Sequence, residues 1–182
     1  MKIRHKLVIL LAVLLITLNG VIAFFIYQRT RHEFTKEVRE EAKLIAMELE
    51  ITRNYLASAL KASKLDITDQ TKHFIPAVSG SIIGLKFAEK TGYVIKQTSI
   101  KYRNLFNKPD AFEEKVLREM EADPNLVEYW DSDVVDGKRV ERYLYALHVK
   151  EDCLLCHGKK ELAPEFIQNN YTAGYDYKAG EL

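Results

Sequence analysis

An apolar run near the N-terminus, Leu7 to Tyr27, constrains this chain more than any other feature. Only three small or polar residues interrupt it. As a helix rising about 1.5 Å per residue it spans roughly 31 Å, close to the thickness of a bilayer's hydrocarbon core. A cleaved signal peptide would have a shorter apolar core and a small-residue cleavage site, which "FFIYQRTR" does not provide. We therefore predict an uncleaved transmembrane signal anchor over residues 7–28.

The charges on either side of this span predict its orientation. Residues 1–6 form a short basic head in which Lys2, Arg4 and Lys6 have no acidic neighbour. The basic residues after the span are diluted by glutamates, and the Lys and Arg counts on the two sides are close. Because an N-terminal anchor with a short basic head normally keeps that head in the cytoplasm, we expect a single-pass protein of the cytoplasmic membrane. Its C-terminal domain would be periplasmic or extracellular. The formal net charge of +1 gives no reason to expect nucleic acid as a partner.

Residues 29–63 predict one long juxtamembrane helix. The segment contains no Gly or Pro, and its apolar residues recur at steps of three and four with a charged opposite face. Such a stripe can pack against the chain's own domain, or it can form the stalk of a homodimer. The sequence leaves both readings open.

The following residues mix helical and strand patterns. Tyr93–Lys101 alternates and predicts a strand, while Asp110 and Glu113 have the spacing of a helix capping box. Two β-rich runs, Val127–Val134 and Val140–Val149, are joined by "VDGK", which predicts a hairpin with an Asp-Gly turn. A helix, a strand, a helix and a hairpin in this order predict an α+β domain with an antiparallel sheet.

The only two cysteines occur in "KEDCLLCHGKK", as Cys153 and Cys156, and His157 follows directly. This spacing is typical of covalent c-type haem attachment, in which two thiols bind the porphyrin and the adjacent histidine is an axial iron ligand. A zinc site would need a fourth ligand, and a disulfide or dithiol would leave the histidine unexplained. We predict one covalent haem c per chain. Haem c is attached outside the cytoplasmic membrane, where the anchor places this motif.

Three segments together resemble a known family: "VIKQTSIKYRNLFNKPDAFEEKVL", "CLLCHG" and "YTAGYDYKAGEL". They are similar to an exported bacterial c-type haem domain with a PAS-like fold, found in membrane-bound sensor histidine kinases and chemoreceptors and as stand-alone proteins. The resemblance covers about Glu40–Leu182. It implies a PAS-like haem c domain over residues 64–182, with His157 as the proximal ligand and a sensory role.

The chain departs from this family in two ways. One branch uses a cysteine on the long N-terminal helix as second axial ligand, and this chain has no third cysteine. The family's tail also normally continues past the position of "AGEL", so we expect a fragment of a longer receptor or a truncated product.

The remaining candidates concern the other side of the iron and the haem carboxylates. His73 is the first choice as sixth ligand, an open position for nitric oxide or carbon monoxide is its equal, and Met47 is the lesser candidate. Lys101 and Arg103 would pair with the haem propionates, although charged residues after a strand can equally be solvated.

These features predict a membrane-anchored haem sensor of redox state or a small gas. A membrane-anchored monohaem cytochrome for electron transfer is the alternative, and a haem-free interaction module is a third reading. The expected partners are the membrane, a second copy through the long helix, and a downstream signalling module or redox partner. No catalytic constellation is present in the sequence, so we expect a protein that is not an enzyme.

Overall fold

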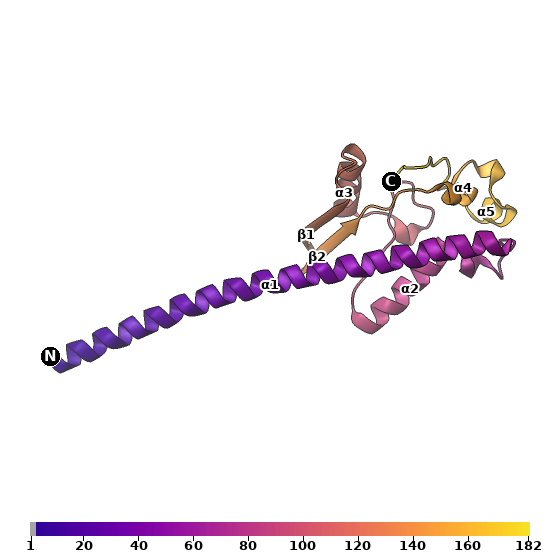
Figure 1. Ribbon diagram of the computed structural model, residues 1–182. Helices are drawn as coiled ribbons and strands as arrows, with labels where there is room; N and C mark the ends of the chain where they lie inside the picture. Colours follow the sequence, from indigo (N-terminus) through magenta and orange to yellow (C-terminus); the bar gives the residue numbers. More distant parts are fainter. Residues whose placement is uncertain (1–2) are drawn as a thin grey trace. The chain divides into compact units, whose positions relative to one another are not determined.

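The computed structural model describes residues 3–182, so Lys2 of the predicted cytoplasmic head lies outside the described residues. The chain divides into two units, residues 1–42 and residues 43–182, which are described separately. Figure 1 shows the helices and strands. In chain order they are α1 (Ile3–Ser63), η1 (Lys72–Phe74), α2 (Pro76–Thr91), η2 (Leu105–Asn107), α3 (Ala111–Ala122), β1 (Glu128–Val135), β2 (Lys138–Tyr145), η3 (Glu151–Cys153), α4 (Leu154–His157), η4 (Lys160–Leu162) and α5 (Glu165–Asn170), where η denotes a 3₁₀ helix.

The first unit consists of α1 up to Ala42. Its apolar run is long and apolar enough to cross a membrane, and none of its side chains is buried. The polar residues inside the run bond back to the helix. Thr17 Oγ1 donates to the carbonyl oxygen of Leu14 at 2.9 Å, and Asn19 Nδ2 donates to that of Leu15 at 2.8 Å. Because hydrocarbon offers these groups no partners, this arrangement is compatible with a single-pass membrane anchor.

The predicted hairpin is confirmed. Strands β1 and β2 pair antiparallel, and the turn between them has Asp136 at φ 51° and Gly137 at φ 74°. Two successive residues with positive φ form the primed turn whose twist matches that of paired strands. The second strand ends at Tyr145 rather than at the predicted Val149. Val149 bonds instead to the C-terminal tail: its N–H donates to Glu181, and its carbonyl accepts from Gly180.

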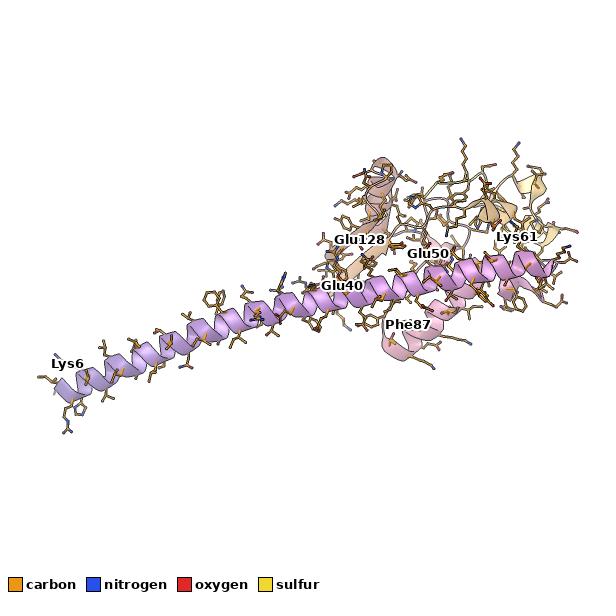
Figure 2. The ribbon with its side chains drawn as sticks, viewed as in Figure 1. Lys6, Glu40, Glu50, Lys61, Phe87 and Glu128 are labelled. Atoms are coloured by element: carbon orange, nitrogen blue, oxygen red, sulfur yellow. The ribbon has the colours of Figure 1, made fainter. Side chains whose placement is uncertain are left out.

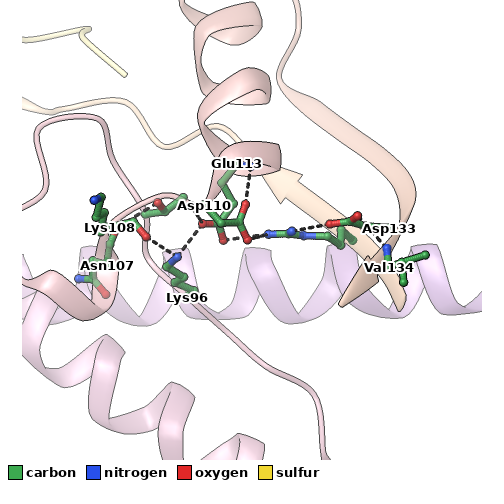
Figure 3. A network of polar contacts seen from close by, with 9 residues as sticks. Lys96, Asn107, Lys108, Asp110, Glu113, Asp133 and Val134 are labelled. Atoms are coloured by element: carbon green, nitrogen blue, oxygen red, sulfur yellow. Dashed lines mark hydrogen bonds and ion pairs between the residues drawn. The ribbon is translucent and has the colours of Figure 1, made fainter. Parts of the chain in front are cut away.

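The predicted capping box at the start of α3 is also confirmed. Asp110 Oδ1 accepts from the Glu113 N–H at 2.8 Å, and Glu113 Oε2 accepts from the Asp110 N–H at 2.9 Å. Arg142 of β2 pairs with Asp110 at 2.7 Å, Glu113 at 3.3 Å and Asp133 at 2.8 Å. Lys96 adds a 2.6 Å ion pair to Glu113. We call these five residues the Arg142 network (Figure 3), and it fastens the first turn of α3 to the hairpin.

Within the Arg142 network, two carboxyl groups have lowered pKa values. The hydrogen bond from Arg142 lowers the pKa of Asp133. Burial opposes ionisation of Asp110, but hydrogen bonds from the Glu113 N–H and from Arg142 outweigh it and lower its pKa. The network therefore holds both carboxyl groups in the charged form.

The predicted strand at residues 93–101 is wrong, because this segment forms no ladder and lies between α2 and η2 as irregular chain. It packs instead on a glycine face of α2. A Cβ added at Gly80 would lie 2.9 Å from Gln97 Nε2, and one at Gly84 would lie 3.3 Å from the carbonyl oxygen of Ile95. Ile95 and Gln97 face α2, while Lys96 between them faces the first turn of α3.

Two small clusters of buried side chains form the core of the second unit. One joins α3 to the end of the hairpin through Val116, Met120 and Ala146. The other joins the segment before α2 to the C-terminal region, and the half-buried Cys156 packs against it. Its buried members are Ile75, Ala163, Ile167 and Tyr175. This second cluster supports the turn that carries the Cys-x-x-Cys-His motif.

Candidate functional site

The motif folds as one compact helical turn. η3 ends at Cys153, and α4 starts at the next residue and carries Cys156 and His157, so the three side chains come from one short helical segment. The turn closes at Gly158, whose N–H donates to the carbonyl oxygen of Leu154 at 2.8 Å. A Cβ at Gly158 would lie 2.6 Å from the same oxygen, so this tight ending needs glycine. Both cysteines are free thiols.

The tail of the chain fixes the orientation of His157. Its Nδ1 lies 3.0 Å from the carbonyl oxygen of Gly174, and its own carbonyl accepts from the Tyr177 N–H at 3.0 Å. The Tyr177 ring packs edge-on against the imidazole, with centroids 5.5 Å apart. Since a carbonyl only accepts, Nδ1 carries the proton, and the lone pair of Nε2 is left to bind a metal.

The imidazole is uncharged near neutral pH. Burial lowers the pKa of His157 to about 4, and the charges of Arg103 and Arg53 act in the same direction, while the hydrogen bond to Gly174 opposes them. A neutral imidazole whose N–H is held by a backbone carbonyl is the usual form of a metal-binding histidine.

Arg103 joins the motif to the tail. Its Nη2 donates to the carbonyl oxygens of Cys156 at 2.7 Å and Gly174 at 2.8 Å. Its guanidinium also lies over the rings of Tyr171 and Tyr175, 5.1 and 4.7 Å from their centroids. Because Gly174 also accepts from His157, one carbonyl links this arginine to the imidazole. Arg103 is thus a positioning residue for the motif.

Gly174 has a backbone conformation that side chains rarely adopt. Its φ is +74°, and an added Cβ would lie 3.0 Å from Arg103 Cβ. Both the dihedral angle and the close approach call for glycine at this position. The "YTAGYDY" tail can therefore reach the imidazole with its carbonyl.

Helix α1 contacts the residues immediately before the motif. Lys61 Nζ pairs with Asp152 at 2.7 Å, and Lys150 Nζ lies 3.1 Å from Asn54 Oδ1 and 3.5 Å from Glu50 Oε1. Figure 2 labels Glu50 and Lys61 along this part of the helix. These contacts lie within the second unit, so its stretch of α1 is part of the site's surroundings.

The chemistry of the donor groups distinguishes among the readings of the motif. Burial raises the pKa of Cys156, with the charge of Arg103 partly opposing it, whereas redox-active dithiols have lowered thiol pKa values. Among residues 3–182, no three His, Cys, Asp or Glu side chains converge as a metal-ion site. Two free thiols in one turn beside a neutral histidine fit haem c, and the buried Arg53 Nε without a hydrogen-bond partner fits an anionic group nearby.

The other predicted site residues have different surroundings. His73 is exposed in η1, and its carbonyl accepts from the Ser79 hydroxyl. Lys101 pairs with Glu181, and its Nζ lies 4.7 Å from the centroid of the Tyr177 ring. Met47, on α1, is 40% exposed. Their roles, and that of Arg103 toward propionates, stay predictions.

Sequence reasoning did not single out three residues that the structure brings to the motif: Arg53, Gly174 and Tyr177. The tail containing Gly174 and Tyr177 belongs to the segments that carry the family resemblance. Its glycine between aromatic residues was the available signal for a close backbone approach. Arg53 resembled every other cation on the polar face of the long helix.

The fold and the site define a class of protein: an α+β domain, joined to an apolar helix, whose helical turn presents two thiols and a metal-competent histidine. The sequence model of the Tll0287-like family matches residues 31–182, so the chain belongs to that family. Among solved structures it is similar to the cyanobacterial heme-protein Tll0287, with 26% identity and a TM-score of 0.63. That match covers 78% of this chain and 88% of the other. No curated protein matches the chain.

Proposed function

We propose that this protein is a membrane-anchored c-type haem domain that senses redox state or a small gaseous ligand and is not an enzyme. One observation carries the proposal: His157 is neutral, its Nδ1 is held by Gly174, and it directly follows Cys156 in one turn with Cys153. Membership in a family with a solved haem protein supports it. Haem would supply an iron centre that changes oxidation state or takes up a ligand.

The residues of this chain have separate tasks in the proposal. The thiols of Cys153 and Cys156 would hold the cofactor, and Nε2 of His157 would bind its iron. The Gly174 carbonyl keeps the proton on Nδ1, while Arg103 holds that carbonyl in place. His73 remains the proposed sixth ligand, with an open position as its competitor.

The sensory part of the proposal rests on α1. This one helix contains the apolar run and also the residues that pair beside the motif, so a shift at the motif acts directly on the helix. An apolar stripe of Leu44, Met47, Ile51 and Tyr55 is exposed on the same helix and would suit a second copy of the chain. We propose a periplasmic or extracellular domain, with a signalling module or redox partner downstream.

The direct test is expression of the full chain together with the haem-attachment machinery. The purified protein should give a pyridine haemochrome spectrum of haem c, and its colour should survive acid–acetone extraction. The double variant Cys153→Ala/Cys156→Ala should lose covalent haem, and His73→Ala should keep it. A colourless wild-type protein under conditions that load a control cytochrome c would refute the proposal.

Carbon monoxide binding then separates an open gas site from a six-coordinate haem with a redox role. Carbon monoxide binding to the reduced protein in micromolar amounts supports a gas site. A six-coordinate spectrum that carbon monoxide does not change, and that His73→Ala converts to a carbon monoxide-binding form, supports a redox role with His73 as ligand. Alkaline phosphatase fused after residue 182 should be active if the domain lies outside the cytoplasm.

A further inference from the structure

Arg53 is the feature of the site that the proposed function leaves unexplained. It lies on α1, and its Nε atom is buried without a hydrogen-bond partner. Only one other buried side-chain nitrogen or oxygen within residues 3–182, Gln97 Oε1, shares this condition. Its helix neighbours Glu50 and Asn54 both contact Lys150, three residues before Cys153, and the charge of Arg53 also acts on His157.

No carboxylate in the described residues compensates this charge through an ion pair. Glu50 is one turn away and favours the charged form, but it pairs with Lys150 at 3.5 Å and accepts a 3.4 Å hydrogen bond from Asn54. Burial lowers the pKa of Arg53, yet a guanidinium stays protonated at every physiological pH. Its Nε is a buried donor of a charged group without an acceptor, which is costly, and proteins normally supply a partner for such a group.

Arg103 makes the same surroundings more positive. It is the second guanidinium whose charge acts on His157, and its own partners are carbonyl oxygens and aromatic rings rather than carboxylates. Two arginines therefore approach the motif, and within residues 3–182 neither forms an ion pair with a carboxylate.

We propose that Arg53 binds an anionic group at the haem site, either a carboxylate of the haem or an anionic ligand of its iron. The inference rests on the proposed haem function and adds an anion-binding residue on α1. The haem carboxylate and the iron-bound anion would be recognised in the same way, because either can accept hydrogen bonds from the N–H groups of a guanidinium. Through this contact the state of the cofactor would act on the helix that carries the apolar run.

The test compares Arg53→Gln with Arg53→Lys in haem-loaded full-length protein. Lys61→Gln is the matched control, because it removes an exposed positive charge from the same helix beside the same motif. Loss of a nearby cation favours the oxidised iron. We expect Arg53→Gln to shift the one-electron redox equilibrium about tenfold toward oxidation, a fall in midpoint potential of 59 mV. Arg53→Lys and Lys61→Gln should shift it less than threefold.

Azide titration of the oxidised protein separates the two sources. If Arg53 binds an anion on the iron, Arg53→Gln should weaken azide binding about tenfold and leave carbon monoxide binding to the reduced protein unchanged. If Arg53 binds a haem carboxylate, Arg53→Gln should leave the azide affinity unchanged and still lower the midpoint potential.

An Arg53→Gln protein with wild-type potential and azide affinity overturns the inference, as does one that changes no more than Lys61→Gln. Should Arg53→Gln not fold, Arg53→Met keeps the apolar stem and takes its place. The haemochrome spectrum of wild type decides the haem function separately, since it does not depend on position 53.

Discussion

Replacing Arg103 by methionine tests whether this side chain holds the motif to the tail. Its two half-buried hydrogen bonds, to Cys156 and Gly174, are worth about 1.5 kcal/mol each as charge-assisted bonds. The third, from Nε to Ala173 at 3.1 Å, is exposed, and water can replace it. Contacts with the two tyrosine rings add about 1 kcal/mol. Arg103 is only half-buried, so water screens its charge, and the guanidinium's recovered hydration offsets only about 1 kcal/mol of this loss. We therefore expect Arg103→Met to lower the free energy of unfolding by about 3 kcal/mol.

The assay is urea unfolding of the haem-loaded protein, followed by circular dichroism at pH 7. Lys101→Met is the matched control, because Lys101 lies two residues away and makes an ion pair with Glu181 whose side chains are 43% and 29% exposed. Such a pair is worth at most about 1 kcal/mol. Arg103→Lys, which keeps the charge but not the planar fork, should fall between the two. If Arg103→Met costs no more than Lys101→Met, the three carbonyl contacts do not hold the motif and the reasoning fails.

Three further predictions follow from other parts of the second unit. Gly174→Ala should destabilise the fold by about 2 kcal/mol, and by more than Gly180→Ala, because both glycines have positive φ but only Gly174 has a neighbour within 4 Å; equal costs in urea unfolding would contradict the close approach to Arg103. In the Arg142 network the pKa values of Asp110 and Asp133 are lower in the folded protein than in the unfolded chain, where they are near 4. The ionised carboxylates therefore stabilise the fold above about pH 4, and this stability is lost as the pH falls through the folded-state pKa values. Unfolding at pH 7 and pH 3 should therefore show a smaller pH-dependent loss in Arg142→Met than in wild type, and an unchanged loss would exclude the network as its source. Ile51→Glu, on the exposed stripe of α1, should abolish dimers of the detergent-solubilised protein in analytical ultracentrifugation, and a wild-type protein that is already monomeric would rule out the stalk.

Local signals predicted much of the fold. The Asp-Gly turn and the capping box of α3 form as expected, since each depends on dihedral preferences or hydrogen bonds within a few residues. The predicted helix over residues 29–63 also forms, because the segment has helical periodicity and contains no Gly or Pro to interrupt a helix. At residues 93–101 the same kind of reasoning failed. An alternating segment needs a strand partner to become a strand, and here two glycines on α2 offered it a closer surface.

The site divides in the same way. The spacing of Cys153, Cys156 and His157 is local, so the sequence by itself determined that one turn would present two thiols and an imidazole. Only the tertiary structure decided the state of that imidazole. Its proton is placed by Gly174, 17 residues further along the chain, and its neutrality follows from burial beside two distant arginines. Charge, burial and hydrogen-bond direction depend on which segments meet after the chain has closed long loops, and no short-range pattern encodes that meeting.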